Sequence, residues 1–178
     1  DLSYKYKKLA RVYGFDRWHV YSTWFNRPYK MVAVAMSNSI KPESVIEIGC
    51  GLGDVISRID STTKIGFDTC YKVLKAASDY HGQTIRWEYG SFLKAQTIEK
   101  DLLIAINWIH NLSPEELEKS ILSNIHTTRY FLLESISENT DGFRFYHDFS
   151  FMEKFSEQID RQECGYGEPR ELMLFRVL

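Results

Sequence analysis

Two acidic residues on either side of a glycine-rich turn are the clearest candidates for chemistry in this chain. Glu47 ends a short apolar segment, Asp68 follows 21 positions later (68 minus 47), and the turn Gly49-Cys-Gly-Leu-Gly53 lies between them. A carboxylate at about that spacing reaches ribose hydroxyls in nucleotide-binding βαβ units. Glycine lets a ligand approach the main chain closely, and the first N–H groups of a following helix would face that ligand. The stretch Ser44–Asp54 therefore predicts a nucleotide-type site.

Two histidines are candidates for proton transfer. His110 follows the apolar run Asp101–Asn107, which predicts a position at the carboxyl edge of the sheet, where ligands of such folds bind. His147 stands between Tyr146 and Asp148, and a carboxylate beside an imidazole can orient its ring. Imidazole exchanges protons near neutral pH. The alternatives are a capping or packing role for His110 and a surface-loop position for His147.

Length and composition bound the class of protein. A chain of 178 residues that is 44% hydrophobic and 15% aromatic predicts one folded domain, residues 1–178. The formal net charge of −2 gives no global electrostatic reason to bind nucleic acid or a membrane surface. No apolar run reaches the roughly 18 residues of a membrane span, and the first residues do not resemble a signal peptide. Three cysteines without a CxxC pair and five histidines without ligand spacing predict a cytoplasmic protein with no disulfide framework and no metal.

Alternating strand and helix patterns supply the elements that would position these residues. Five strands are predicted, at residues 45–48, 63–68, 84–89, 101–107 and 130–135. Helices are predicted at residues 55–59 after the glycine turn, at 71–80, from the capping box of Ser113 and Glu116 onward, and at 151–159. Two final strands, at residues 161–166 and 172–177, are joined by Gly167-Glu-Pro169 in a hairpin-like connection. An antiparallel pair at the end indicates a mixed α/β sheet.

The first forty residues are rich in aromatic and basic side chains and predict a helical cap, residues 1–40. Pro28 fits the first turn of a helix within this cap. His19, Arg27 and Tyr29 are candidate substrate contacts, and a guanidinium suits a carboxylate or a phosphate. The alternative is that the aromatic residues pack the cap onto the domain and the basic residues are solvated.

The order of the motifs resembles that of the class I S-adenosylmethionine-dependent methyltransferases. The resemblance runs from about Ser44 to Leu178, and four segments carry it: Glu47–Gly53, Gly66–Asp68, Gly90–Phe92 and Asn107–Glu116. It implies a Rossmann-like α/β fold for a cofactor-binding core at residues 44–178. The family's seven-stranded mixed sheet has the order 3-2-1-4-5-7-6, with strand 7 antiparallel and helices on both faces. In the cap, Trp18-His19 and Arg27-Pro-Tyr29 resemble small methyltransferases of bacterial surface-polysaccharide gene clusters.

The resemblance implies S-adenosylmethionine as the cofactor and suggests roles by position. Asp68 would bind the ribose hydroxyls, and Glu47 would orient the turn and the methionine amine. Ser91 stands where the family carries an acid for the adenine. The implied cofactor contacts are Glu47, Gly49, Cys50, Gly51, Gly53, Asp68, Thr69, Ser91, Phe92, Asn107 and Trp108. The catalytic candidates are His110, His147 and Asn107, and the candidate substrate contacts are His19, Arg27, Tyr29 and Tyr146.

These residues favour transfer of a methyl group to a small-molecule acceptor, with O-methylation of a sugar or polysaccharide precursor as the favoured class. Such a transfer needs alignment, and it needs a base only where the acceptor must lose a proton. One alternative is a methyltransferase-like protein that binds the cofactor without catalysis and acts through a partner. Another is a nucleic-acid methyltransferase that uses the basic cap. A third, a dinucleotide-dependent oxidoreductase, would carry Gly-x-Gly-x-x-Gly, whereas Gly53 falls one residue early.

Overall fold

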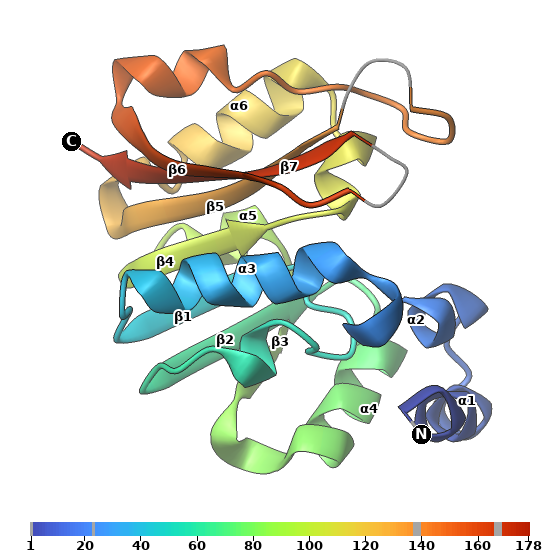
Figure 1. The fold of residues 1–178 in the computed structure, drawn as a ribbon. Coiled ribbons are helices and arrows are strands. Elements are labelled where there is room, and N and C mark those ends of the chain that lie inside the picture. The colour runs from blue at the N-terminus through green and yellow to red at the C-terminus, as the bar shows by residue number, and fades with distance from the viewer. Residues whose placement is uncertain (1, 23, 137–139, 166–168) are drawn as a thin grey trace.

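A seven-stranded mixed sheet forms the centre of the computed structural model, which describes residues 2–22, 24–136, 140–165 and 169–178 (Figure 1). The strands are β1 Ser44–Ile48, β2 Thr63–Asp68, β3 Arg86–Tyr89, β4 Lys100–Ala105, β5 Thr128–Ile136, β6 Ser156–Glu163 and β7 Arg170–Val177. They lie in the order β3-β2-β1-β4-β5-β7-β6. Strand β7 is antiparallel to both β5 and β6, and the other pairs are parallel. The predicted order and the antiparallel strand 7 are confirmed.

Helices cover both faces of this sheet. The α-helices are α1 Leu2–Tyr13, α2 Arg17–Tyr21, α3 Pro28–Ser39, α4 Tyr71–His81, α5 Phe92–Ala95 and α6 Pro114–Leu122. Short 3-10 turns lie at Trp24–Asn26, Ile56–Arg58, Gly82–Thr84, Trp108–Asn111, Ile125–Thr127 and Ser150–Lys154. Within the described ranges, no helix has the length and apolar composition needed to cross a membrane.

Each face of the sheet has its own apolar cluster, because alternate residues of a strand point to opposite faces. On one face the strands pack against α3 through Ala33 and Met36. On the other face they pack against α5 and α6, through Phe92, Leu117 and Ile121. Both faces of the sheet are thereby covered by helices. Its carboxyl edge at β1 and β4 is the place where ligands of open α/β sheets bind.

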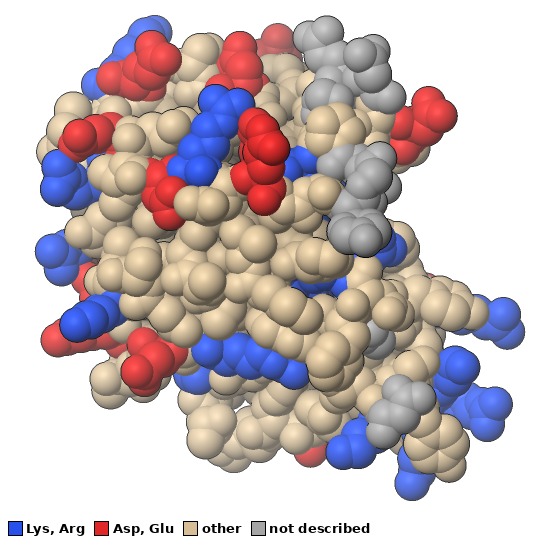
Figure 2. Space-filling view, viewed as in Figure 1, with Lys and Arg blue, Asp and Glu red and all other residues tan. Residues whose placement is uncertain are grey.

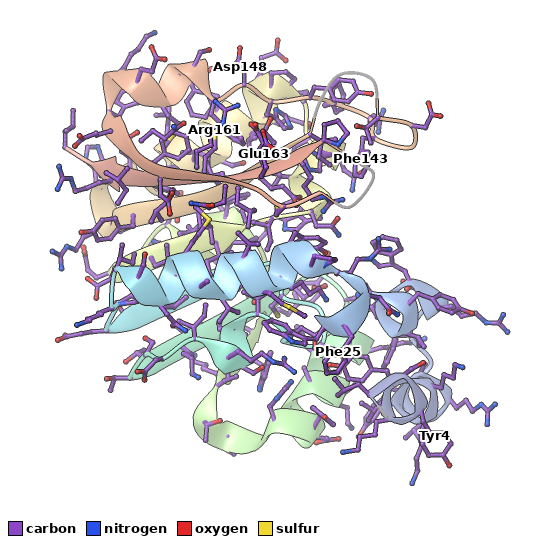
Figure 3. The ribbon with its side chains drawn as sticks, viewed as in Figure 1. Tyr4, Phe25, Phe143, Asp148, Arg161 and Glu163 are labelled. Atoms are coloured by element: carbon purple, nitrogen blue, oxygen red, sulfur yellow. The ribbon has the colours of Figure 1, made fainter. Side chains whose placement is uncertain are left out.

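The first two helices pack across this edge rather than on either face of the sheet. Tyr6 of α1 and Val20 of α2 form a third apolar cluster with Leu52 of the glycine turn and Val73 of α4. The outer surface of α1 and α2 is basic (Figure 2), with exposed Lys5, Lys7, Lys8, Arg11 and Arg17. Two aromatic side chains, Tyr4 and Phe25, are each 70% exposed on this part of the chain (Figure 3).

The prediction of a helix at residues 55–59 is wrong. A single 3-10 turn, Ile56–Arg58, follows the glycine turn, because only residues 54–62 separate that turn from β2. The N–H group of Ile56 donates to the Glu47 carboxylate at 3.0 Å. The N–H group that a helix would have presented to a ligand is therefore bonded to a buried side chain.

The prediction of a helix at residues 151–159 is also wrong. A 3-10 turn spans Ser150–Lys154, and strand β6 extends from Ser156 to Glu163 instead of starting at residue 161. The apolar residues between positions 151 and 159 recur every four positions, as they do on one face of a helix, and this spacing led to the wrong prediction. Strand β6 is an edge strand with mostly exposed, polar side chains, so it lacks the alternation that marks a half-buried strand. The connection predicted at Gly167–Pro169 includes residues outside the described ranges.

Candidate active site

A cavity of about 350 Å³ opens at the carboxyl ends of β1, β2 and β4, against the N-terminal helices. This volume lies in the range of sites that hold small ligands. The lining comes from the cap, the glycine turn, the residues after β2 and β3, and the segment after β4. The lining residues are Trp18, His19, Ser22, Tyr29, Lys30, Glu47, Ile48, Gly49, Cys50, Gly51, Leu52, Asp54, Val55, Asp68, Thr69, Gly90, Ser91, Ile106, Asn107, Trp108 and Asn111.

The glycine turn has a backbone that residues with a Cβ adopt only under strain. Gly49, Gly51 and Gly53 have φ angles of 75°, 54° and 78°. The N–H groups of Gly49 and Cys50 both donate to the carbonyl of Phe67, at 2.7 and 3.0 Å. These two bonds hold the turn against the end of β2.

Trp108 covers the turn so closely that Gly49 cannot carry a side chain. A Cβ at Gly49 would lie 2.2 Å from Trp108 Cδ1, and the indole Nε1 donates to the Ile48 carbonyl at 2.6 Å. We expect Gly49→Ala to destabilise the protein by about 3 kcal/mol, since backbone strain adds to displacement of the indole. Urea denaturation followed by tryptophan fluorescence measures this loss.

Gly82→Ala is the matched control for that substitution. Gly82 also has a φ of 75°, but a Cβ there would meet nothing within 4 Å. We expect this variant to lose less than Gly49→Ala, about 1–3 kcal/mol, because its cost is limited to a backbone (φ 75°, ψ −158°) that favours glycine. Equal losses in the two variants would contradict the role given to Trp108.

Asp68 ends β2 and shapes the turn with its carboxylate. Its Oδ2 accepts from the Gly51 N–H at 2.9 Å, and its Oδ1 accepts from the Cys70 N–H at 2.8 Å. An ionised carboxylate offers about four lone-pair sites, so both oxygens keep capacity for ligand hydroxyl groups. Asp68 and the adjacent Thr69 lie on the cavity wall.

Glu47 contributes a buried carboxyl group to the same wall. The side chain is 4% exposed, and it accepts from the Ile56 N–H at 3.0 Å. Burial raises the pKa of Glu47 to about 8, and the Ile56 N–H and the Lys30 ammonium only partly oppose this effect. Below that pH the group is therefore mainly protonated when no ligand is bound.

The raised pKa of Glu47 predicts that stability falls as the pH rises from about 4.5 to about 8. Over this range the unfolded chain releases the Glu47 proton and the folded protein keeps it, so the stabilisation present at low pH is progressively lost. Glu47→Gln resembles the protonated form and can still accept from the Ile56 N–H. We expect this variant to exceed the wild type in free energy of unfolding at pH 8 by on the order of 3 kcal/mol.

Urea denaturation of both proteins at pH 5 and at pH 8 tests the Glu47 prediction. The advantage of Glu47→Gln should shrink at pH 5, where the wild-type carboxyl is protonated. A variant that is less stable than the wild type at pH 8 would show that Glu47 is ionised and satisfied in the folded protein.

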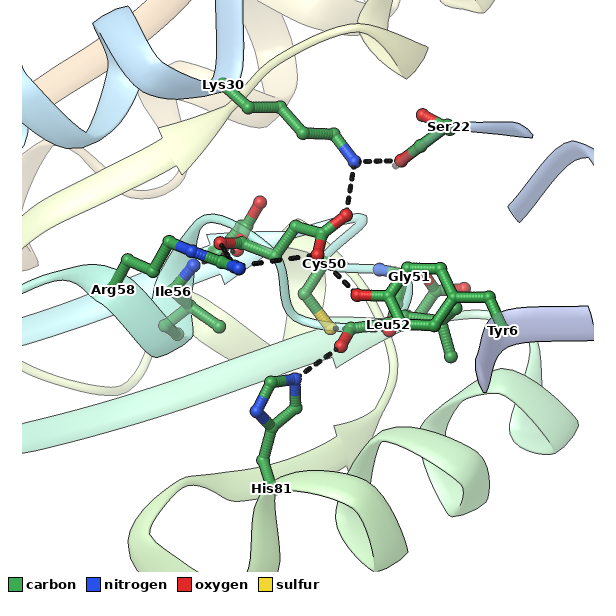
Figure 4. A network of polar contacts seen from close by, with 12 residues as sticks. Tyr6, Ser22, Lys30, Cys50, Gly51, Leu52, Ile56, Arg58 and His81 are labelled. Carbon is green, nitrogen blue, oxygen red and sulfur yellow. Dashed lines mark hydrogen bonds and ion pairs between the residues drawn. The ribbon is translucent and has the colours of Figure 1, made fainter. Parts of the chain in front are cut away.

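A polar network ties the cap to the residue that follows the glycine turn (Figure 4). Asp54 is 3% exposed, and its carboxylate accepts from the Tyr6 hydroxyl and from Lys30 Nζ, the latter at 2.8 Å. Lys30 Nζ also donates to the Ser22 carbonyl, and Arg58 lies 3.5 Å from the same carboxylate. Burial and the Asp54 charge raise the pKa of Tyr6, so its hydroxyl remains a donor. The network fixes α1 and α3 relative to the turn.

A second network, centred on the buried Glu134, holds the segment after β4. Glu134 accepts from Arg170 Nη1 at 2.7 Å, from the Asn107 N–H, and lies 3.1 Å from His110 Nε2. The Arg170 guanidinium also lies over the Tyr29 ring, 4.4 Å from its centroid. Asn107 has a φ of 71°, which asparagine tolerates better than most residues. The network therefore positions two residues of the cavity wall, Asn107 and Tyr29.

The cavity brings together most of the predicted contacts. From the predicted cofactor set it is lined by Glu47, Gly49, Cys50, Gly51, Asp68, Thr69, Ser91, Asn107 and Trp108, and from the predicted substrate set by His19 and Tyr29. Phe92 instead lies in the core, with its ring 5.7 Å from that of Trp108. Gly53 packs beneath Trp87, because a Cβ there would lie 2.4 Å from the indole.

The two histidines predicted to transfer protons do not line this cavity. His110 is 1% exposed, and its Nε2 lies 3.1 Å from Glu134 Oε2, so the structure places the ring away from the cavity. His147 is also buried, with its Nε2 3.0 Å from the Ile109 carbonyl, and burial lowers its pKa. The Tyr146 hydroxyl donates to the Thr140 carbonyl beside a separate depression. Arg27 lies over the Trp18 ring, 5.0 Å from its centroid, and does not line the cavity.

Several residues of the site were missed by sequence reasoning. They are Trp18, Lys30, Asp54 and Asn111 on the cavity wall, and Glu134 and Arg170 behind it. Glu134 carried a signal, because a charged residue within the apolar strand β5 requires a buried partner. No local sequence pattern marked Lys30 and Asp54, since their pairing depends on where the cap docks.

Comparisons with known proteins identify the fold. No protein-family model matches the chain, and no curated protein sequence matches it significantly. The solved N-methyltransferase NodS from Bradyrhizobium japonicum WM9, in complex with S-adenosyl-L-homocysteine, is 17% identical, with a TM-score of 0.78 and 99% of each chain covered. Magnesium protoporphyrin IX methyltransferase (ChlM) from Synechocystis PCC 6803, with the same ligand bound, is 12% identical, with a TM-score of 0.73 and 100% of each chain covered. The chain has the class I methyltransferase fold. The likeness extends over the cap as well as the core, because these comparisons cover nearly the whole chain.

Proposed function

We propose that the protein is an S-adenosylmethionine-dependent methyltransferase. The observation that carries this proposal is the cavity in which the glycine turn and the Asp68 carboxylate meet at the switch point of the sheet. Two solved proteins of the same fold, NodS and ChlM, have S-adenosyl-L-homocysteine bound. S-adenosylmethionine supplies a methyl group on a sulfonium, which is an excellent leaving group.

The residues of the cavity fit this ligand. Asp68 retains lone pairs for the two ribose hydroxyls while it holds the Gly51 N–H. Gly49 and Gly51 line the cavity with their main chain, which suits the amino-acid part of the ligand. A cationic ligand would favour the ionised form of Glu47, whose carboxyl lies on the same wall. Ser91, at the start of α5, would border the adenine.

A sugar or sugar-linked acceptor, methylated at oxygen, is the finer part of the proposal. Trp18 is 50% exposed on the cavity wall and offers a flat apolar face to a sugar ring. The side chains of Asn107 and Asn111 offer donors and acceptors to its hydroxyl groups. The cap borders the cavity, which suits a small acceptor.

Transfer of a labelled methyl group tests the proposal. The protein is incubated with S-adenosylmethionine labelled in its methyl group and with a panel of nucleotide sugars and methyl glycosides. We expect label in at least one carbohydrate and an equal amount of S-adenosyl-L-homocysteine. Label in added nucleic acid and in no carbohydrate would overturn the acceptor class. Failure to bind S-adenosylmethionine would overturn the activity itself.

A further inference from the structure

His19 of the cap places one edge of its ring against the glycine turn. The side chain is 19% exposed and lines the cavity. A Cβ built on Gly51 would lie 3.3 Å from His19 Cδ2 and 3.8 Å from Nε2. The ring edge that carries Nε2 therefore faces the turn, and no described residue forms a hydrogen bond with Nε2.

Asp16 determines which nitrogen of this ring carries the proton. Its Oδ1 lies 3.0 Å from His19 Nδ1, and the same oxygen caps α2 by accepting from the His19 N–H. An ionised carboxylate can only accept a hydrogen bond, so Nδ1 carries the proton of the neutral ring. The Phe15 ring packs edge-on at 5.7 Å and restrains the imidazole. Nε2 is left as an acceptor on the cavity side.

The other titratable groups on this wall are engaged or hold their protons. They are Tyr29, Lys30, Glu47, Cys50, Asp54 and Asp68. Lys30 pairs with Asp54, Asp68 accepts from the Gly51 N–H, and the Glu47 carboxyl, whose pKa burial raises to about 8, accepts from the Ile56 N–H. Burial raises the pKa of both Cys50 and Tyr29. Within the described part of the chain, His19 Nε2 is thus a ring nitrogen on this wall that has no hydrogen-bond partner and is placed to accept a proton.

We infer that His19 is the general base of the reaction and that the acceptor is a hydroxyl group, an inference that rests on the proposed function. The acceptor oxygen forms the new bond to the methyl carbon, and the electron pair of the broken carbon–sulfur bond remains on sulfur. The hydroxyl proton passes to His19 Nε2. Asp16 stabilises the resulting imidazolium, which releases its proton to water when the product leaves.

The tautomer of His19 tests this inference without an acceptor. Long-range ¹H–¹⁵N NMR spectra of ¹⁵N-histidine-labelled protein, saturated with S-adenosyl-L-homocysteine, show which ring nitrogen carries the proton. We expect the proton on Nδ1 in the wild type and a shift toward Nε2 in Asp16→Ala. A wild-type ring protonated at Nε2 would overturn the inference. Absence of S-adenosyl-L-homocysteine binding would overturn the proposed function instead.

Turnover of a methylated carbohydrate gives the second test. We expect His19→Gln to lower kcat by about 10²–10⁴-fold and to remove the fall of kcat/KM at acid pH. Asp16→Asn should lower kcat by about tenfold and change the pH profile, because a positioning residue acts through the ring. His126→Gln, at an exposed histidine outside the cavity, is the matched control and should leave kcat unchanged. A kcat of His19→Gln within about threefold of the wild-type value would overturn the inference. If no carbohydrate on the panel is methylated, the tautomer measurement alone decides the inference.

Discussion

Asp68→Ala is expected to weaken the binding of S-adenosyl-L-homocysteine by about 10²–10⁴-fold. Two hydrogen bonds from ribose hydroxyls to a charged group contribute about 1.5–3 kcal/mol each, and every 1.4 kcal/mol is tenfold in affinity. The substitution also frees the N–H groups of Gly51 and Cys70, which the carboxylate now holds. Calorimetric titration of the variant beside the wild type measures the loss.

Asp68→Asn separates the two consequences of that substitution. The amide oxygen can still accept from one backbone N–H, but the side chain loses its charge and half of its acceptor capacity. We expect an affinity between those of the wild type and Asp68→Ala, with a thermal midpoint close to that of the wild type. Unchanged affinity in Asp68→Ala would remove Asp68 from the cofactor site.

Arg170→Met is expected to lower the free energy of unfolding by about 3–5 kcal/mol, because it leaves the Glu134 carboxylate buried without its main counter-charge. Glu134 is 0% exposed and Arg170 5% exposed. The loss should also loosen Asn107 and Tyr29, which the network positions on the cavity wall. Urea denaturation gives the stability.

A double-mutant cycle and a surface control sharpen the Arg170 prediction. Glu134→Gln with Arg170→Met should lose less than the sum of the single losses, since both charges are then absent. Arg161→Met removes the ion pair between Arg161 and Glu171, in which the Arg161 side chain is 54% exposed, and should cost less than about 1 kcal/mol. A similar cost for Arg161→Met and Arg170→Met would contradict the burial argument.

The parts of the fold predicted correctly are those with strong local signals. Strand β1 is a short apolar run bounded by turn residues, and α6 begins with a capping box in which the Ser113 hydroxyl accepts from the Glu116 N–H at 3.2 Å. The prediction for β6 failed because the apolar residues that recur at helical spacing belong to a 3-10 turn and to an exposed edge strand. A local pattern of apolar residues indicates which face of an element is buried, and the edge strand β6 buries few of its side chains.

The site was predictable where spacing along the chain fixes geometry. Glu47 and Asp68 lie near the ends of the adjacent parallel strands β1 and β2, and the glycine turn directly follows β1, so their proximity follows from one pair of neighbouring strands. The positions of His110 and His19 were not predictable in this way. His110 is buried by Glu134 and Arg170 from distant strands, and His19 reaches the turn only because α2 docks beside it. Their positions depend on tertiary packing, which no local pattern encodes.

The most direct test of the proposed cofactor is calorimetric titration of the wild-type protein with S-adenosyl-L-homocysteine and, separately, with NADH. We predict one site with micromolar or tighter affinity for S-adenosyl-L-homocysteine and no binding of NADH. Binding of NADH alone, or of neither ligand, would contradict the assignment of this cavity to a methyl donor.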